Sequence, residues 1–375
     1  MSREKLLKLG PYAAFLQRRW RLGAARTAGS LRNVFSRDYK EKKISLHKIM
    51  RLHSKGWGVD DWAMCGGGMN AEKAENYLST VDYKRMHPFN GSYSSWIDDK
   101  LTLMYLCQAP ELKSLMPDYY YQVMGGAVLP LPDCPDNLRD CGARGVLSCL
   151  ERFGELAIKQ IKGSLGKGFY KAEIRNGEIL VNGSVMSRDK FMSFISSSEG
   201  YIVTEYLHPH PEMSKFSKNT ANTIRYLVAN VNGAPLFLTS FIRFGTKASG
   251  LVENYNSGGV LCYLDEEGCY RGGNVIDFKN KRNIKIETHP DTGAPLVGRV
   301  PLWDEMQTAA RVFIKHFPQL VYLGFDFVAS DKGVKMLEIN SLSSLDVLQL
   351  DQSAFDLPNG EWFRERLAKV KQGAL

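Results

Sequence analysis

Apolar and polar residues alternate over much of the second half of the chain. From about residue 155 this alternation predicts strands, and Asn176–Gly177 and Asn232–Gly233 predict two hairpin turns between strand-like runs. A helical period of apolar residues occurs in three segments, 96–108, 302–317 and 360–373. The pattern therefore predicts an α+β fold with long strands and few helices.

The stretch YLGFDFVASDKGVKMLEINSLSS, residues 322–344, predicts a further hairpin. A three-residue turn, Asp331–Gly333, with glycine in the left-handed position suits a type I turn followed by a bulge. That turn places Ser330 opposite Val334. Counting outward along the two strands then places Asp326 opposite Glu338.

Three oxygen-bearing side chains share one face of this predicted hairpin, because Asn340 lies on the same side as Glu338. The opposite, core-facing side is predicted to carry Phe325, Phe327, Leu337 and Ile339. Two carboxylates ~5 Å apart at an effective dielectric of ~20 repel by roughly 3 kcal/mol. Either the face is solvated or a divalent cation lies between the carboxylates. Hard oxygen ligands without His or Cys favour Mg²⁺ or Mn²⁺.

A glycine-rich segment, IKQIKGSLGKGFYKAEI, lies between two predicted strands. Gly163, Gly166 and Gly168 allow backbone N–H groups to approach phosphate oxygens, and Lys159 on the preceding strand could add a positive charge. The spacing matches neither the Walker A loop nor the Rossmann fingerprint. A flap over a nucleotide and a merely flexible hairpin both remain open.

Composition indicates a globular protein of two or three domains. The 375 residues are 44% hydrophobic and 24% charged. The seven cysteines are scattered without a CxxC motif, which is typical of reduced thiols in the cytoplasm. No apolar run approaches the ~18 residues of a membrane helix, and the N-terminus lacks the features of a signal peptide. We therefore expect a cytoplasmic protein.

The net charge of +9 is concentrated near the N-terminus. Residues 1–60 contain 15 basic and 4 acidic residues, a net +11, so the remainder carries −2. Such an arm could contact the inner face of an anionic membrane, nucleic acid or an acidic polymer. Alternatively, the arm is a solvated surface helix, or Leu6, Phe15 and Trp20 pack on the body. Beyond the arm no basic stripe is interleaved with aromatic residues, which argues against nucleic acid as a partner.

The order of these motifs resembles that of the ATP-grasp superfamily over roughly residues 95–350. The DDK motif, in which Asp98 or Asp99 caps a helix, looks like the site of the first ATP lysine. The FDF…MLEIN pair resembles the metal-binding end. The resemblance implies the following ATP-binding residues: Lys100, Lys159, the flap residues Gly163, Ser164, Gly166 and Gly168, and the adenine-edge residues Glu205, Tyr206 and Leu207. It also implies Arg225, Arg243 and Asn254 near the phosphates, and Asp326, Glu338 and Asn340 as metal ligands.

Two further groups are weaker candidates. Glu212 could hold the ribose or a substrate amine, or be merely solvated. Ser341, Ser343 and Ser344 could donate hydrogen bonds to a carboxylate or an acyl phosphate, or simply form a serine-rich turn.

The arginines present a geometric conflict. With a two-residue turn at Asn232–Gly233, Arg225 faces Ser240, whereas Arg243 faces Asn222 on the other side of the hairpin. An ideal hairpin cannot point both arginines at one phosphate. Either a bulge intervenes or one arginine is structural.

A closer resemblance is to the sugar-transfer-associated ATP-grasp proteins of capsule, O-antigen and exopolysaccharide gene clusters. Its marks are NGSYSSWIDDKLTLMYL, HPHPEM, NTIR, NSGG, HPDTGAPLVG and EINSLSSLDVLQLDQ. The resemblance implies two α+β lobes that clasp ATP. The expected division is a basic helical arm at 1–60, a helical and linker region at 61–140, a first lobe with the flap at 141–207, and a second lobe with the metal site and a helical tail at 208–375.

The implied activity is ATP-dependent ligation of a carboxylate to an amine through an acyl phosphate. ATP and two Mg²⁺ ions are the expected cofactors, with Mn²⁺ as an alternative metal. A sugar carboxylate and an amino acid or amine are the expected substrates. An ATP-grasp phosphotransferase and a non-catalytic binding protein remain as alternatives.

Overall fold

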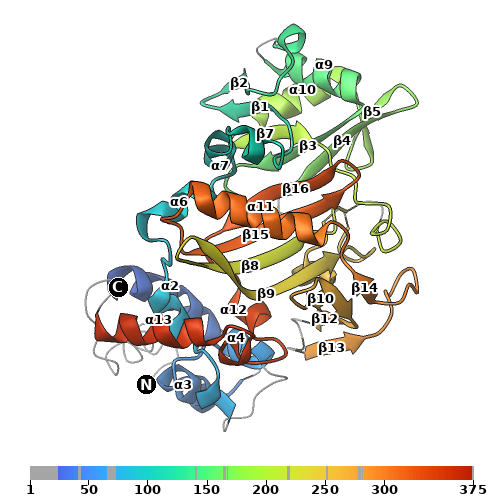
Figure 1. Cartoon of the computed structure of the whole chain (residues 1–375). Helices are drawn as coiled ribbons and strands as arrows, with labels where there is room; N and C mark the ends of the chain where they lie inside the picture. The colour runs from blue at the N-terminus through green and yellow to red at the C-terminus, as the bar shows by residue number, and fades with distance from the viewer. Residues whose placement is uncertain are drawn as a thin grey trace.

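Alternating apolar residues between positions 119 and 205 build the first of two large antiparallel sheets. The computed structural model describes residues 24–40, 44–65, 73–139, 142–163, 166, 168–217, 220–250, 252–277, 280 and 282–373. The strands of the first sheet, in spatial order, are β2 (Ala127–Pro130), β1 (Tyr119–Met124), β7 (Tyr201–Glu205), β3 (Glu155–Gln160), β4 (Tyr170–Arg175), β5 (Glu178–Val181) and β6 (Ser184–Met186). Helices α9 (Ala143–Phe153) and α10 (Arg188–Ser197) cover one face of this sheet (Figure 1).

The second sheet carries the C-terminal half of the chain. Its strands, in spatial order, are β13 (Arg282–Ile286), β12 (Gly273–Asp277), β10 (Val260–Leu264), β9 (Ala234–Phe244), β8 (Ile224–Val231), β15 (Tyr322–Ser330) and β16 (Gly333–Asn340). Helix α11 (Trp303–His316) packs on one face, and Figure 1 shows it in front of β15 and β8. A small third sheet pairs β11 (Cys269–Arg271) with β14 (Val297–Arg299).

The remaining helices lie outside the large sheets, and most of them are short. They are α2 (Ala24–Asp38), α3 (Leu46–Ser54), α4 (Val59–Met64), η2 (Lys73–Asn76), α5 (Thr80–Met86), η3 (Gly91–Tyr93), α6 (Ser94–Asp98), α7 (Lys100–Leu106), α8 (Pro110–Lys113), η4 (Asp136–Leu138), η5 (Tyr255–Ser257), α12 (Leu345–Leu348), η6 (Ala354–Asp356) and α13 (Glu361–Gln372). The predicted α+β class is confirmed. Among the residues that the structure describes, no helix combines the length and apolar content needed to cross a membrane.

One segment of the predicted linker region is instead part of the first sheet. Residues 119–130 form the hairpin β1–β2, with Gly125 and Gly126 at positive φ in the turn, and β1 pairs with β7. The linker prediction is wrong there because three consecutive tyrosines obscure the alternation, while β1 is buried on both faces. We propose residues 117–207 as the first lobe.

In the β15–β16 hairpin Asp326 lies opposite Glu338 as predicted, but the turn and the register differ from the prediction. The turn is one residue tighter than predicted, since Ser330 pairs with Gly333. A bulge then shifts the register between Asp326 and Phe327, so that Asp326 still lies opposite Glu338. The bulge also contradicts the placement of Leu337 on the core side, because Leu337 lines the cavity described below.

A bulge in the β8–β9 hairpin resolves the conflict between the arginines. The register shifts between Leu227 and Val228, which places Arg225 opposite Phe241 rather than Ser240. Arg243 is two residues beyond Phe241 on β9, and both arginines therefore share one face of the sheet. Of the two alternatives, the bulge is confirmed.

The described part of the basic arm packs on the body. Leu31 and Phe35 contact Val81, and Tyr39 and Trp57 belong to a buried aromatic cluster. Leu6, Phe15 and Trp20 lie outside the described residues.

Deletion of residues 1–60 is expected to destabilise the protein severely. It removes Phe35, Tyr39 and Trp57, which are at most 2% exposed. Truncation of one such aromatic residue typically costs about 3–5 kcal/mol. A melting curve should show early unfolding or aggregation. An unchanged melting temperature after deletion of 1–60 would contradict this packing.

Candidate active site

A cavity of about 460 Å³ lies between the two large sheets. Most of the residues predicted from the sequence line it: Lys100, Lys159, Gly163, Gly166, Glu205, Tyr206, Leu207, Arg225, Arg243, Asn254, Asp326, Glu338 and Asn340. Gly168 and Glu212 do not line it, and Ser164 is outside the described residues. The two lobes thus contribute cations, carboxylates and apolar side chains to one space.

Lys100 is held at the start of a helix. Of the two predicted capping residues, Asp99 is the N-cap of α7. Asp99 Oδ1 accepts hydrogen bonds from Leu101 N (3.0 Å) and Thr102 N (2.9 Å). Lys100 Nζ lies 2.8 Å from Glu338 Oε2 and donates to the carbonyl oxygen of Gly163 at 3.0 Å. This lysine therefore connects the helical region, the flap and the second lobe.

Lys159 enters the cavity from β3 and, within the part of the chain described, makes no ion pair. Its ammonium lies 5.8 Å from the ring centroid of Tyr119. Burial and the nearby charge of Lys100 lower the pKa of Lys159 to about 8, against the opposing effect of Glu338. An amine in this position is stabilised in its charged form by any anion that enters the cavity.

Asp326 is clamped by both arginines. Arg225 Nε donates to Asp326 Oδ1 (2.5 Å), and Arg225 Nη2 (3.1 Å) and Arg243 Nη2 (3.1 Å) approach Oδ2. Burial alone would raise the pKa of Asp326, but the two guanidinium charges lower it well below its usual range. The predicted repulsion between Asp326 and Glu338 is therefore offset by the protein's own cations. Neither solvent nor a metal is needed to balance the two carboxylates.

The predicted metal ligands fit Mg²⁺ in kind. Asn340 Nδ2 donates to Glu338 Oε1 (3.2 Å), so its amide oxygen points elsewhere, and Asp326 lies opposite Glu338. Oxygen ligands of this type suit Mg²⁺, which commonly takes one or two carboxylates and completes its shell with phosphates and water. Among the described residues no three or more His, Cys, Asp or Glu side chains gather closely enough to hold a metal. A metal here would therefore depend on ligands from a substrate.

The flap needs its glycines for close contacts. Gly166 has φ +66°, and a Cβ there would lie 2.9 Å from Val252 Cγ1. Gly168 has φ +71°, and a Cβ there would lie 2.6 Å from Tyr201 Oη. Gly166 thus reaches a loop of the second lobe across the cavity, whereas Gly168 packs against its own sheet.

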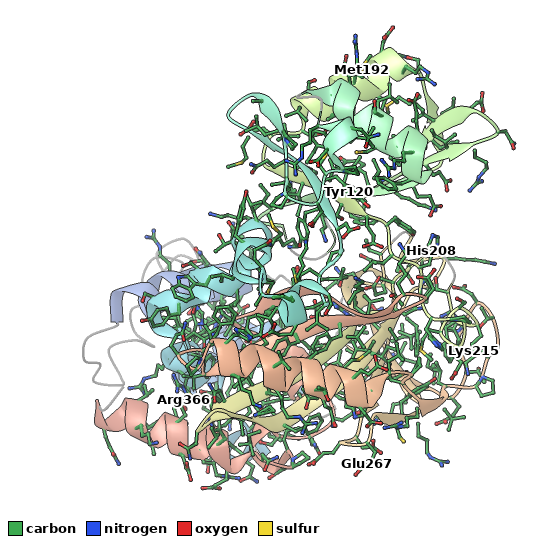
Figure 2. The ribbon with its side chains drawn as sticks, turned by 45° about the horizontal axis from the view of Figure 1, so that its top comes forward. Tyr120, Met192, His208, Lys215, Glu267 and Arg366 are labelled. Carbon is green, nitrogen blue, oxygen red and sulfur yellow. The ribbon has the colours of Figure 1, made fainter. Side chains whose placement is uncertain are left out.

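The predicted adenine edge lies where the chain passes from one lobe to the other. Glu205 Oε2 accepts from Asp118 N (3.0 Å), and Glu205 Oε1 accepts from Lys332 Nζ (2.6 Å). His208 also connects the lobes through Nε2, 2.6 Å from Glu155 Oε2, and Figure 2 shows it at their junction. Figure 2 places Tyr120 and Met192 well within the first lobe.

The remaining candidates differ in position. Asn254 lines the cavity, and its Oδ1 accepts from Asn256 N (3.0 Å) at the start of η5. Glu212 is exposed on a turn away from the cavity, so its predicted contact with ribose or a substrate amine has no geometric support here.

Some contacts at the site were missed. Asp98 accepts from both Ser341 N (2.9 Å) and Ser341 Oγ (2.7 Å), and Arg225 Nη1 donates to Ser343 Oγ (3.2 Å). Glu253 accepts hydrogen bonds from the backbone and hydroxyl of Thr223. The serine-rich turn after Asn340 was a sequence signal for the contacts of Ser341 and Ser343. No local sequence pattern indicated the contact between Glu253 and Thr223.

Lys159→Ala is expected to weaken ATP binding by about 1.5–3 kcal/mol, roughly tenfold to 100-fold, because a charge-assisted phosphate contact is lost. In the wild type, ATP affinity should fall as the pH rises through about 8, where Lys159 loses its charge. The variant should lack this step.

Calorimetric titration across pH 7–9.5 measures both effects on Lys159. Lys190→Ala, an exposed lysine on α10, is the matched control. Equal affinities and equal pH profiles for wild type and Lys159→Ala would refute a phosphate contact at this lysine.

The site has the character of a polyanion-binding cleft between two lobes, with cations from both lobes converging on a cavity that contains carboxylates. A comparison of the sequence with models of protein families identifies the family. The chain belongs to the Sugar-transfer associated ATP-grasp family, which it matches over residues 82–372. No curated protein matches the sequence significantly.

Several solved structures resemble this chain at low sequence identity. The ligase PsnB, complexed with a precursor variant, Mg and ADP, has a TM-score of 0.39 and 11% identity over 75% of this chain and 61% of its own. The D-alanyl-alanine synthetase A of Vibrio cholerae O1 biovar eltor has a TM-score of 0.40 and 13% identity over 76% and 66%. The D-alanine–D-alanine ligase of Bacillus anthracis has a TM-score of 0.40 and 13% identity over 80% and 78%. This chain therefore spans less than two thirds of the length of the first two proteins.

Proposed function

We propose that the protein is an ATP-dependent carboxylate–amine ligase that acts through an acyl phosphate. We further propose that it joins an amino acid or amine to a sugar carboxylate in the synthesis of a surface polysaccharide. The observation that carries the proposal is the convergence of Lys100, Lys159, Arg225 and Arg243 on one cavity of an ATP-grasp protein. The sugar follows from the family's association with sugar transfer.

In this proposal different residues of the cavity bind the adenine and the phosphates of ATP. Glu205, Tyr206 and Leu207 hold the adenine edge. Lys159, which has no ion pair among the described residues, and Lys100 face the phosphates. The flap covers them and excludes water that would hydrolyse an acyl phosphate.

The two arginines take different roles. Arg225 uses all three of its nitrogens on Asp326 and Ser343. Arg243 uses one nitrogen on Asp326, and its Nε has no partner among the described residues. Arg225 therefore positions Asp326, and we assign to Arg243, with Asn254, the contact with the transferred phosphoryl group.

Glu338, Asn340 and Asp326 would hold Mg²⁺, or Mn²⁺ in its place. When bound, the metal supplies charge stabilisation to phosphoryl oxygens. The cations of the cavity act in the same direction, since they are in place before negative charge develops on those oxygens.

The chemistry has two balanced steps. A carboxylate oxygen of the first substrate attacks the γ-phosphorus, the bond to the β-phosphate oxygen breaks, and ADP and an acyl phosphate form. The amine of the second substrate then attacks the acyl carbon. The C–O bond to phosphate breaks, the amine loses a proton, and an amide and inorganic phosphate result.

Incubation of the full chain with ATP, Mg²⁺, uronic acids and a panel of amino acids tests the proposal. We expect ADP and phosphate to form together with a product of amide mass. Release of ADP with a phosphorylated sugar would identify a phosphotransferase instead. Absence of ATP turnover with every pair would identify a binding protein.

We also propose that residues 1–23, which hold 6 basic residues and 1 acidic residue, contact an anionic membrane on the cytoplasmic side. Each Lys or Arg near such a surface contributes about 1 kcal/mol. Full-length protein should float with anionic vesicles at low salt and not at high salt. Deletion of 1–23 should abolish flotation, and unchanged flotation would rule out the contact.

A further inference from the structure

A second cavity, of about 1330 Å³, adjoins the first. The two cavities share Lys100, Gly163, Glu338, Asn340 and Leu342 in their walls. They therefore meet at the Lys100–Glu338 ion pair, the end of the ATP cavity where the proposed metal ligands lie. A molecule in the second cavity can thus reach the place where phosphoryl transfer would occur.

One continuous stretch of chain forms most of the second cavity's wall. Residues 84–102 run from the end of α5 through η3 and α6 into α7, and contribute Lys84, His87, Trp96 and three serine side chains. The hydroxyl groups provide many hydrogen-bonding positions. Trp96 adds an aromatic surface to a wall that also contains the apolar side chains of Pro88, Ile339 and Leu342. A few aromatic surfaces among many polar groups suit a hydroxylated ring, whose C–H faces stack while its hydroxyls bond.

The acidic groups of this cavity are already satisfied. Both oxygens of Asp98 accept from Ser341, Asp99 caps α7, and Glu338 pairs with Lys100. Their hydrogen-bonding capacity is therefore largely committed to the protein, and the charge of Glu338 is balanced by Lys100.

The basic and neutral groups are not satisfied to the same degree. Within the described chain, Lys84 makes no hydrogen bond or ion pair shorter than 4 Å, and Lys162 has only a contact of 3.6 Å with Asp99. His87 Nδ1 and Ser94 Oγ are buried with no hydrogen-bond partner in the described structure. Buried polar atoms without a partner are costly and commonly mark the place of a ligand or water. Lys84 and Lys162 can only donate and carry positive charge, whereas His87 Nδ1 and Ser94 Oγ can each donate or accept a hydrogen bond. The two lysines favour a ligand that carries negative charge.

We propose that the second cavity binds the sugar substrate as a hydroxylated ring that bears a carboxylate, with the ring on Trp96 and the negative charge attracted by Lys84. This inference rests on the proposed function for the role of the ligand, but the binding itself does not require ATP turnover. The cavity is large enough to admit a hydroxylated ring.

The test measures binding of D-glucuronate, D-glucose and L-alanine to the full chain by saturation-transfer NMR and calorimetry, with and without Mg²⁺ and a non-hydrolysable ATP analogue. We expect glucuronate to bind at least tenfold more tightly than glucose and L-alanine not to occupy this cavity. Trp96→Ala and Lys84→Met should each weaken glucuronate binding tenfold or more. Tyr105→Ala and Lys190→Met, which change exposed residues elsewhere, should not.

The outcomes separate this inference from the proposed function. If ATP is turned over but glucuronate binding is absent, or is unaffected by both Trp96→Ala and Lys84→Met, the cavity assignment is wrong and the ligase proposal stands. If L-alanine binds and Lys84→Met abolishes it, the cavity takes the amino acid, and the inference is also wrong. Glucuronate binding that survives Lys159→Ala but is lost with Lys84→Met supports the inference even if no ligase product is found. Melting curves of both variants confirm that loss of binding is not loss of fold.

Discussion

Glu338→Gln is expected to lower ATP-dependent turnover by about 100-fold or more, which corresponds to ~2.7 kcal/mol of transition-state stabilisation. The substitution removes the negative charge that would hold Mg²⁺, and it changes the contact with Lys100 at the junction of the two cavities. Stability should change by only about 1 kcal/mol, because the glutamine oxygen still accepts from Lys100 and the neighbouring Asp326 loses a like-charged neighbour.

Steady-state ADP release at saturating ATP and Mg²⁺ measures the effect of Glu338→Gln. The matched control is Glu365→Gln, an exposed glutamate on α13, which should retain full activity. Normal Mg²⁺-dependent turnover by Glu338→Gln would show that the metal assignment is wrong.

Asp326→Asn is expected to lower the free energy of unfolding by about 3–5 kcal/mol, the usual cost of removing one partner from a buried ion pair. Asp326 is 3% exposed and holds Arg225 and Arg243 from neighbouring strands. The neutral amide leaves the two guanidinium groups without the carboxylate that they contact, and only the more distant Glu338 remains as a negative charge. The substitution should therefore affect stability far more than Glu338→Gln does, although the two residues lie opposite each other in one hairpin.

Urea unfolding of the wild type, Asp326→Asn and Glu338→Gln measures this difference. Asp304→Asn breaks an exposed pair with Arg299 and is the control, with an expected loss below about 1 kcal/mol. A loss for Asp326→Asn no larger than that of the control would mean that the arginines do not depend on Asp326.

The sequence predicted the pairing of Asp326 with Glu338 although it missed both local features that produce it. The alternation of apolar residues defines the faces of β15 and β16, but it does not distinguish a three-residue turn from a two-residue turn followed later by a bulge. The two errors cancel beyond the bulge, where Asp326 and Glu338 pair as predicted, whereas Leu337 lines the cavity instead of the core. A bulge inserts one residue and shifts the phase of the alternation, which here changes between Met336 and Ile339, both of which are buried in the core.

The contact of the arginines with Asp326 could not be predicted from local sequence patterns. Arg225 and Asp326 are 101 positions apart, and only the pairing of β8 with β15 brings them together. From the hairpin alone, two opposed carboxylates required solvent or a metal. The sheet supplies arginines instead. Short-range patterns thus identified the residues of the site, whereas long-range pairing decided how their charges are balanced.

Transfer of oxygen from the carboxylate substrate to phosphate tests the central claim most directly. The full chain is incubated with ATP, Mg²⁺, an amine and a uronic acid whose carboxylate carries ¹⁸O, and the inorganic phosphate is analysed by mass. An acyl phosphate route predicts one ¹⁸O atom in each phosphate released, with ADP and amide formed in equal amounts. Amide formation with unlabelled phosphate, or phosphorylation of the sugar without release of phosphate, would contradict it.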